Sequence, residues 1–326
     1  MKTFIETTPQ TTQALQRYSL NGATMGTRYS AIFYAPAGLD SHGVNTALDA
    51  AVQQVDQQMS TYRPDSALNQ LNAAPLQQWL PLPKELLEVL QTALLVGAQS
   101  NGAFDIAVGD LVNAWGFGPN QGQPDPEQIN RLQSQPRQAA ATLLMLEPSQ
   151  QRVRKQAPAC FDLNGIAKGF AVDQLAAVLD AQGISRYLVG IDGEMRARGQ
   201  KDDGQPWAVA VEKPLRGIRA VMGVMELSDV AIATSGDYRH WRTLAGQDYA
   251  HSMHPLLRTP LRNQLSAVTV LADSCMLADA WATALMVLGE VAGPALAQTL
   301  GLHALFVLRD GDGWREILVV DGQLQA

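Results

Sequence analysis

The stretch ADAWATALMVLG, residues 278–289, carries apolar side chains at nearly every position. Such a pattern predicts a helix that is buried on all sides. Asp279 and Thr283 lie within it, four residues apart, so a helix places this carboxylate and this hydroxyl one turn apart on the same side. Two oxygen donors on one side of an apolar helix suggest a ligand site. The alternative is that Asp279 caps the helix and that Thr283 bonds back to a carbonyl one turn earlier.

Composition indicates a globular chain with a large core. The chain has 326 residues, of which 46% are hydrophobic and 17% are charged. The formal net charge is −7 and no run of Lys or Arg stands out, which argues against nucleic-acid binding. Cys160 and Cys275 are far apart in the sequence and lie in apolar contexts, so we expect two buried thiols rather than a disulfide framework.

The N-terminal segment predicts a tail rather than a targeting signal. Residues 1–16 are polar and have no apolar core of a secretory signal, and we assign the single domain to residues 17–326. We see no run of about 18 apolar residues and expect no membrane span. These features favour a cytoplasmic location for the chain as written. A periplasmic or inner-membrane-associated location is the alternative if an export segment is missing.

Strand and helix patterns alternate irregularly along the chain, which predicts an α+β fold with largely antiparallel sheets. Residues 17–36 indicate two strands around a Gly-containing turn, and residues 120–138, rich in Gln and Pro, indicate an exposed insertion. Helical periodicity is present at 43–59, 84–99, 168–181, 278–289 and about 292–300. Strand patterns are present at 143–147, 152–156, 186–192, 207–213, 219–227, 230–236, 265–272, 303–309 and 315–320.

Several common catalytic signatures are absent from the sequence. It has no G-x-G-x-x-G after a strand, no G-K-[ST] phosphate loop, no H-E-x-x-H, no G-x-S-x-G and no C-x-x-C. The usual nicotinamide, ATPase, zinc-protease and esterase assignments therefore lose support.

The segment FDLNGIAKGFAVDQLA, residues 161–176, has the composition of a ligand-binding turn that leads into a helix. Gly165 and Gly169 allow the backbone to approach a ligand closely, and Lys168 between them can meet a phosphate. Asp162 ends the preceding strand-like segment. Taken alone, the segment is also typical of an ordinary Gly-rich turn with a solvent-facing Lys, which is the more frequent case.

Three further stretches carry polar groups in turns. HSMHP (251–255) contains His251 and His254, but the spacing beside a Pro is a poor metal motif. Asp105 in GAFDIAVG (102–109) could cap a helix. TYRPDSALNQLN (61–72) has the pattern of a turn followed by a capped helix. Each stretch read singly favours a structural role.

Taken together and in order, these stretches resemble the ApbE-type FAD:protein FMN transferases, from about residue 18 to the C-terminus. The matching motifs are MGT (25–27), STYRPDSALNQLN (60–72), GAFDIAVG (102–109), DLNGIAKGFAVD (162–173), ATSGDY (233–238), HSMHP (251–255) and ADAWATALMVLG (278–289). The resemblance implies a single α+β unit related to the T-fold, with FAD held in a cleft between its lobes. It also implies Mg²⁺-dependent transfer of FMN from FAD to a Thr or Ser hydroxyl of a partner flavoprotein of a redox complex, with release of AMP.

The resemblance also assigns roles to individual residues. It implies that Mg²⁺ is bound by the side chains of Asp279 and Thr283 and by the carbonyl of Gly165. It implies that FAD is contacted by Met25, Tyr62, Ala103, Phe104, Asp105, Asp162, Lys168 and His251, with Tyr62 and Phe104 able to stack on its flat rings. Asp279 and His251 are the catalytic candidates, and His251 is suited to take the proton of the acceptor hydroxyl.

The sequence departs from the family pattern on the acceptor side. His254 occupies the position of the Asp in the family's H-x-x-D-P motif, and the T-G that normally follows is missing from HPLLRTP (254–260). Two other functions are therefore weighed beside transfer. One is Mg²⁺-dependent hydrolysis of FAD to FMN and AMP, and the other is FAD binding or flavin delivery without turnover.

Overall fold

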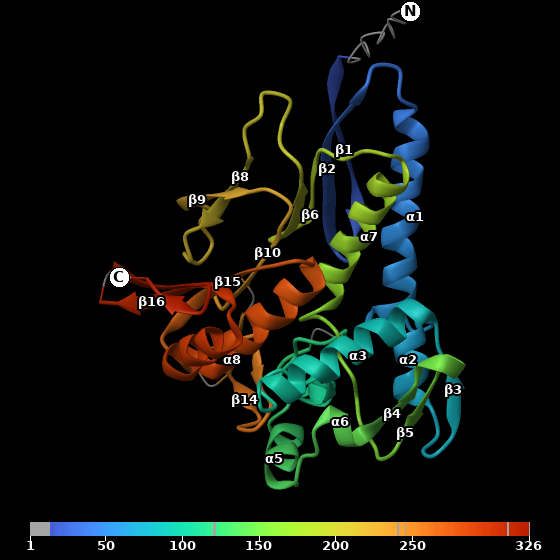
Figure 1. Ribbon diagram of the computed structural model, residues 1–326. Coiled ribbons are helices and arrows are strands. Elements are labelled where there is room, and N and C mark those ends of the chain that lie inside the picture. The colour runs from blue at the N-terminus through green and yellow to red at the C-terminus, as the bar shows by residue number, and fades with distance from the viewer. Residues whose placement is uncertain (1–13, 120–121, 240, 245, 312, 326) are drawn as a thin grey trace, which may run out of the picture.

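The computed structural model describes residues 14–119, 122–239, 241–244, 246–311 and 313–325. Most of the polar tail expected over residues 1–16 lies outside the described residues, and the first strand already begins at Leu15. The element types confirm the α+β expectation, because the largest sheet is antiparallel throughout and helices pack against it (Figure 1).

A nine-stranded sheet forms the centre of the molecule. Its order is β1 (Leu15–Thr24), β2 (Thr27–Pro36), β6 (Tyr187–Ile191), β7 (Glu194–Arg198), β10 (Ala231–Gly236), β15 (Leu265–Ala272), β16 (His303–Asp310), β17 (Gly313–Val320) and β18 (Gln323–Leu324). The predicted strands around the Gly-containing turn are β1 and β2, joined by Met25 and Gly26. Both joining residues have positive φ, 47° and 72°, as tight two-residue hairpins require.

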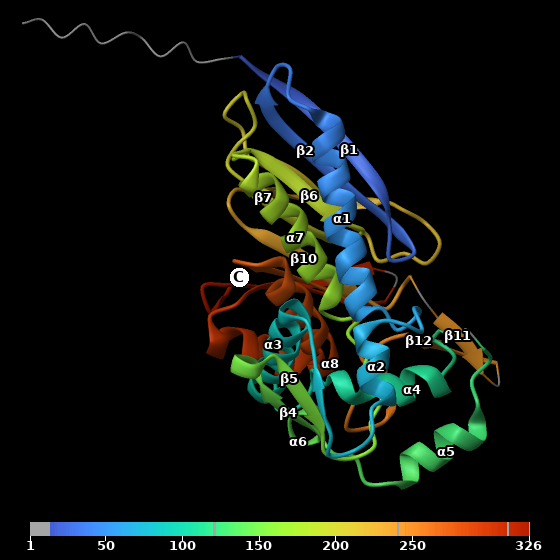
Figure 2. The ribbon, with the colours of Figure 1, turned by 90° about the vertical axis from the view of Figure 1, so that its right-hand side faces the viewer.

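Three long helices cover one face of this sheet. They are α1 (Ser41–Met59), α7 (Ala167–Ala181) and α8 (Cys275–Leu300), and α1 and α7 lie side by side in both views (Figures 1 and 2). Within α8, Gly289 leaves the helical region with a φ of 79°, so the predicted pair of helices is present as one element with a break. A core of fully buried apolar side chains fills the space between the helices and the sheet.

The hairpin of β8 (Trp207–Glu212) and β9 (Val221–Leu227) covers part of the other face. Trp207 and Leu227 of this hairpin pack against Tyr34 of β2 and Ile232 of β10, and all four side chains are buried. The central strands therefore have apolar contacts on both faces, which explains the long uninterrupted apolar runs in their sequences.

A second group of elements packs against the end of α1 and against α8, at the bottom of Figure 1. Its helices are α2 (Ala67–Ala73), α3 (Lys84–Gln99), η1 (Ile106–Val108), α4 (Gly109–Ala114), α5 (Pro126–Ser134), α6 (Ala140–Leu143) and η2 (Pro148–Gln150). A small sheet has the order β3 (Trp79–Pro81), β5 (Arg152–Lys155) and β4 (Leu144–Glu147). Two short pairs complete the fold: β11 (Trp241–Leu244) with β12 (Gln247–Ala250), and β13 (Met253–His254) with β14 (Thr259–Pro260).

The expected exposed insertion contains an ordered helix. Residues 126–134 form α5, which begins after Asp125 because that carboxylate accepts backbone N–H bonds from Glu127 and Gln128. Ile129 is buried against Leu111 and Trp115 of the α4 region. Within this Gln- and Pro-rich segment, burial of the single side chain of Ile129 holds the short helix against the rest of the fold.

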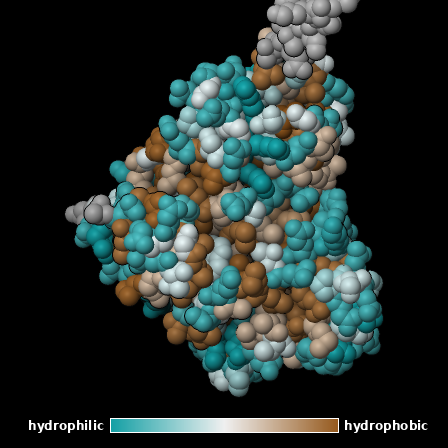
Figure 3. Space-filling model, viewed as in Figure 1, coloured by the Kyte–Doolittle hydropathy of each residue, from teal (hydrophilic) through white to brown (hydrophobic). Residues whose placement is uncertain are grey.

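The sequence predicted no membrane span, and one helix among the described residues bears on that prediction. By length and hydropathy alone, α8 is long and apolar enough to cross a bilayer, but 67% of its most apolar window is buried inside the protein. The face of the molecule in Figure 3 mixes hydrophilic and hydrophobic residues instead of presenting an unbroken apolar belt. The apolar character of α8 therefore serves the core, where it packs on β10, β15 and β16.

The contact between α7 and α8 depends on a glycine. A Cβ added at Gly169 would collide with the carbonyl oxygen of Cys275 and would lie 2.8 Å from the Cβ of Asp279. Asp173, one turn further along α7, accepts N–H bonds from Cys275 at 3.0 Å and Met276 at 2.9 Å. The first turn of α8 is thus held directly on α7.

We predict that Gly169→Ala destabilises the protein by about 2–4 kcal/mol, although alanine is normally the better helix former. The added methyl group must push apart two packed backbones. Urea unfolding of the variant measures this loss. Gly223→Ala on β9 is the control, because nothing lies within 4 Å of the added Cβ there. Equal stability of the two variants would contradict the close approach of α7 and α8.

Candidate functional site

Thr283 packs against Gly165, and Asp279 bonds to Gly169, where α8 crosses the start of α7. Asp279 is only 4% exposed, and its Oδ2 accepts the backbone N–H of Gly169 at 3.0 Å. A Cβ added at Gly165 would lie 3.0 Å from Oγ1 of Thr283, so this glycine backbone packs directly against the threonine. The three residues that the family resemblance groups therefore lie along one contact between α8 and the start of α7.

The structural alternatives for this pair do not match the contacts. Ser274 is the N-cap of α8, and its side chain accepts the N–H of Leu277 at 3.2 Å. Asp279 lies beyond the first turn of α8, and its carboxylate accepts the backbone N–H of Gly169 on α7. The hydroxyl of Thr283 lies 3.0 Å from the hydroxyl of Ser235 on β10, so its partner is on a neighbouring strand.

A buried acidic residue that the sequence analysis missed lies beside this group. Glu194, the first residue of β7, is 3% exposed and forms an ion pair with Lys168, whose Nζ donates to Oε1 at 2.8 Å. Among the described residues, the other oxygen of Glu194 is buried without a hydrogen-bond partner. An acceptor left open in this way is costly unless a ligand donates to it. The signal in the sequence was a carboxylate at the start of an otherwise half-buried strand.

Burial and neighbouring charge favour a neutral Asp279 when no ligand is present. Burial raises the pKa of Asp279 above its ordinary value, the negative charge of Glu194 raises it further, and Lys168 and the Gly169 N–H oppose the shift. If Asp279 were ionised as well as Glu194, two carboxylates beside one ammonium would leave an excess of negative charge in a poorly solvated place. A bound cation would relieve this excess and favour ionised Asp279.

Two ion pairs join α7 to β7, and the acidic partner lies on β7 in one pair and on α7 in the other. Lys168 of α7 pairs with Glu194 of β7, and Asp173 of α7 pairs with Arg196 of β7 at 2.5 Å. Asp173 also binds the start of α8 through backbone N–H groups. The three elements that carry Asp279, Lys168 and Glu194 are therefore held in one frame.

The β1–β2 turn, which contains Met25, approaches the same region. The hydroxyl of Thr27 donates to Oδ1 of Asp192 at 2.9 Å. Asp192 lies in the β6–β7 turn, two residues before Glu194. This bond brings the Met25 turn to the edge of the group formed by Lys168 and Glu194.

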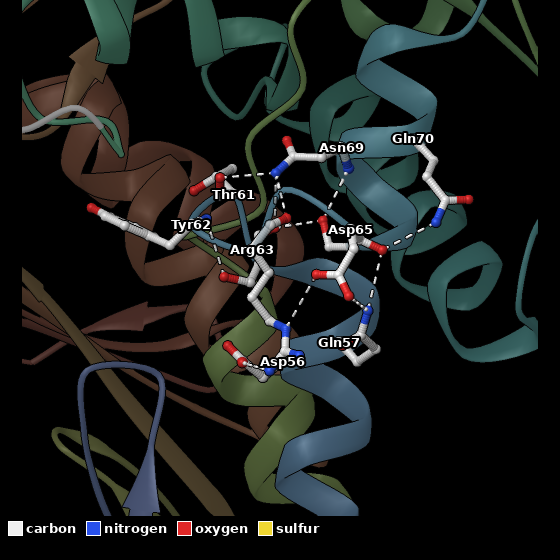
Figure 4. Close-up of polar contacts among 10 residues, drawn as sticks. Asp56, Gln57, Thr61, Tyr62, Arg63, Asp65, Asn69 and Gln70 are labelled. Atoms are coloured by element: carbon white, nitrogen blue, oxygen red, sulfur yellow. Dashed lines mark hydrogen bonds and ion pairs between the residues drawn. The ribbon is translucent and has the colours of Figure 1, made fainter.

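A network of side-chain-to-backbone bonds shapes the turn that carries Tyr62 (Figure 4). Nδ2 of Asn69 donates to the carbonyls of Thr61 at 2.9 Å and Arg63 at 2.8 Å. Ser66 caps α2, the short helix that the sequence predicted to be capped, by accepting the N–H of Asn69. Figure 4 shows the Tyr62 ring projecting away from this network, and the ring is 50% exposed.

The turn at Ala103, Phe104 and Asp105 has a structural role that the sequence left as an alternative. Oδ1 of Asp105 accepts the N–H groups of Ala107 at 2.8 Å and Ala140 at 3.2 Å. Phe104 is 4% exposed, and its ring lies against Gly165. Of the two aromatic side chains suggested for stacking, Phe104 is therefore closed in, and only Tyr62 offers an open ring. Phe104 and Asp105 also line an apolar cavity of about 270 Å³.

Asp162 is buried beside this turn. Its backbone N–H donates to the carbonyl of Ile106 at 2.8 Å, and its carboxylate accepts the backbone and side-chain N–H groups of Asn164 at 2.8 and 3.1 Å. Burial raises the pKa of Asp162 to about 6, although the Asn164 backbone bond opposes the shift. Burial also raises the pKa of Tyr62, and the charge of Asp162 adds to this effect. Tyr62 and Asp162 are therefore electrostatic neighbours.

His251 joins Tyr62 through Phe117. The His251 and Phe117 rings meet edge to face with centroids 6.4 Å apart, and the hydroxyl of Tyr62 donates to the Phe117 carbonyl at 3.3 Å. The guanidinium of Arg242 lies 5.7 Å from the centre of the Phe117 ring. Tyr62, Phe117 and His251 therefore form an aromatic wall near Asp162, and Arg242 adds a positive charge beside it.

His254 has a clear local function in the turn that follows. Its Nδ1 accepts the backbone N–H of Leu257 at 3.3 Å, and burial lowers its pKa. The imidazole therefore acts as an acceptor that holds this turn. Within the described part of the chain, no three His, Cys, Asp or Glu side chains converge as a metal site. A cation at Asp279 would therefore need hydroxyl, carbonyl and ligand oxygens as well.

Comparison with known proteins gives one consistent match. The model of the family described as "ApbE family" matches residues 25–306. A Vibrio cholerae protein named FAD:protein FMN transferase is 38% identical over 307 residues, which cover 92% of this chain and 90% of that protein. An Escherichia coli K12 protein of the same name is 35% identical over 312 residues, covering 94% and 88%.

Solved structures agree with this match. The flavin transferase ApbE from Vibrio cholerae superimposes with a TM-score of 0.84 at 36% identity, covering 95% of this chain and 99% of that one. The apo form of the Pseudomonas stutzeri flavinyl transferase ApbE gives a TM-score of 0.83 at 34% identity, covering 95% and 98%.

We predict that Asp162 makes the stability of the chain fall as the pH rises. Its folded pKa, about 6, lies above the ordinary value of 3.8, so the folded state holds the proton more tightly. This stabilisation is complete below pH 3.8 and is lost as the pH rises through about 6. Between about pH 4.5 and 7.5, wild type should lose roughly 2 kcal/mol of unfolding free energy relative to Asp162→Asn. Parallel urea titrations measure the difference, and a constant gap would refute the assignment.

Proposed function

This chain belongs to the ApbE family, and on that premise we propose that it transfers FMN from FAD to a Thr or Ser hydroxyl of a partner flavoprotein, releasing AMP and requiring Mg²⁺. The observation that carries the proposal is that Thr283 packs against Gly165 and Asp279 bonds to Gly169, beside the ion pair of Lys168. That arrangement places hard oxygen donors next to a cation suited to phosphate.

The donors along this contact fit Mg²⁺. Asp279 supplies a buried carboxylate, Thr283 a hydroxyl and Gly165 a backbone carbonyl, and Mg²⁺ prefers such oxygen ligands while keeping places for water and phosphate. A side chain at Gly165 would crowd the threonine hydroxyl, so the glycine keeps this place open. When bound, the ion would neutralise charge on the diphosphate as the bond to AMP breaks.

The start of α7 is suited to hold the diphosphate of FAD. The side chain of the N-cap residue, Ile166, makes no cap bond, but the N–H of Ala167 donates to the Leu163 carbonyl and that of Gly169 to Asp279. Lys168 lies in the first turn and adds a positive charge. The positive end of the helix dipole and the Lys168 ammonium both favour a phosphate here.

The flavin and acceptor groups are assigned to the wall formed by Tyr62, Phe117 and His251. Tyr62 offers an exposed aromatic face for the flavin rings. In the transfer step, the acceptor hydroxyl oxygen attacks the phosphorus of the FMN half, the bond to the AMP phosphate oxygen breaks, and AMP leaves with the electron pair. His251 takes the proton of the hydroxyl.

Hydrolysis of FAD to FMN and AMP is the second candidate, and His254 is the observation that favours it. A neutral imidazole stands where the family motif has a carboxylate, so the acceptor side lacks one negative group. Water needs less positioning than a protein hydroxyl. The partner we propose is a flavoprotein of a redox complex, in the cytoplasm or, if the chain is exported, in the periplasm.

We predict that Asp279→Asn lowers FMN transfer at least about 100-fold, which corresponds to the loss of metal-dependent charge stabilisation. Asparagine retains an oxygen that can accept the Gly169 N–H, so the fold should persist. The assay combines FAD, Mg²⁺ and a peptide with the family's acceptor motif, and follows in-gel flavin fluorescence and AMP release. Labelling supports transfer, AMP without labelling supports hydrolysis, and tight FAD binding without either product supports a carrier. Full activity of the variant would reject the proposed site.

We also predict that His254→Asp raises FMN transfer several-fold while leaving stability unchanged. A carboxylate can accept the same Leu257 N–H bond, so the turn is retained. His254→Asn is the matched control, because it restores a side-chain oxygen without the charge. If both variants match wild type in the fluorescence assay, position 254 does not contribute to transfer.

A further inference from the structure

Ser235 contacts the proposed metal ligand Thr283 through its hydroxyl. It belongs to the ATSGDY stretch (233–238) and lies on β10. Its Oγ lies 3.0 Å from Oγ1 of Thr283, and either hydroxyl can donate. Ser235 is half-buried, so its side chain lies at the boundary between the core and the site.

The position of β10 makes this contact stable. The strand lies inside the nine-stranded sheet between β7 and β15, and α8 packs across it. Successive residues on a strand point to opposite faces, so Ser235 faces α8 while Thr234 faces away from it. Thr234 makes its own hydroxyl contact with Thr269 of β15 at 2.8 Å. Two adjacent residues thus make similar bonds on opposite sides of one strand.

A threonine hydroxyl that binds a cation must direct a lone pair toward the ion. Its proton then points away and becomes a better donor, so it needs an acceptor nearby. Groups that accept from a metal ligand fix its orientation and strengthen its binding. Ser235 is the hydroxyl partner that the fold provides for Thr283.

We propose that Ser235 is a positioning residue, which accepts the Thr283 proton and turns the threonine lone pair toward Mg²⁺. This inference rests on the proposed function, because it needs Thr283 to be a ligand. Ser235 acts through Thr283 and does not itself bind the ion.

The test is a double-mutant cycle read by the Mg²⁺ dissociation constant. Mg²⁺ alone is titrated into the full chain by calorimetry, and the Mg²⁺ concentration for half-maximal FMN transfer is the second readout. We expect Ser235→Ala to weaken Mg²⁺ binding about 10-fold. Ser235→Thr, which keeps a hydroxyl, should restore binding. Thr283→Val should weaken binding at least as much, and adding Ser235→Ala to it should have no further effect.

Thr234→Val is the matched control, because it removes a hydroxyl contact from the same strand on the opposite face. It should leave the Mg²⁺ dissociation constant unchanged. Equal weakening by Thr234→Val and Ser235→Ala would overturn the inference in favour of general loosening of β10. An effect of Ser235→Ala that persists beside Thr283→Val would overturn it in favour of direct ligation by Ser235.

The outcomes also separate this inference from the function on which it rests. If Thr283→Val weakens Mg²⁺ binding and Ser235→Ala does not, only the positioning role is refuted. If Thr283→Val leaves both Mg²⁺ readouts unchanged, the metal assignment fails and the positioning role fails with it.

Discussion

The site depends on the close approach of α7 and α8. At Gly169, any side chain would collide with the backbone of Cys275. The N–H of Gly169 donates a hydrogen bond to Asp279 across the same contact. One residue therefore both permits the helices to touch and orients the buried carboxylate. Asp173 repeats the connection one turn away by binding the start of α8. Because packed helices deform little, the position of Asp279 is fixed before any ligand arrives.

Buried charge is concentrated between these elements. Burying a carboxylate costs several kcal/mol unless partners compensate it, and Asp279 and Glu194 share Lys168 as their nearby cation. One oxygen of Glu194 has no partner among the residues that the structure describes. The fold thus retains unfavourable electrostatics that a cation and a polar ligand would relieve. Such uncompensated groups are typical of functional sites rather than of a core selected for stability alone.

Local patterns in the sequence predicted the parts of this site that depend on local geometry. The four-residue spacing of Asp279 and Thr283 follows from helix periodicity, and the glycines of 161–176 indicated a close backbone approach. Glu194 and Ser235 were not found, because their significance comes from contacts with residues far away in the chain. The burial of Phe104 was missed for the same reason: exposure depends on what the rest of the fold places against a ring. Likewise, α5 depends on the burial of Ile129 by a distant segment.

The two halves of the proposed site differ in construction, and His254, where the sequence analysis expects a departure from the family motif, lies in the less constrained half. The half assigned to the diphosphate is built from α7, α8 and β7, which are tied by ion pairs and a glycine contact. The half assigned to the acceptor is built from turns, where Tyr62 is 50% exposed and Leu256 and Leu257 are each 65% exposed. A substitution in the first half disturbs several elements at once. In the second half, His254 preserves its turn by using an imidazole nitrogen as acceptor, so this position can change without loss of the fold.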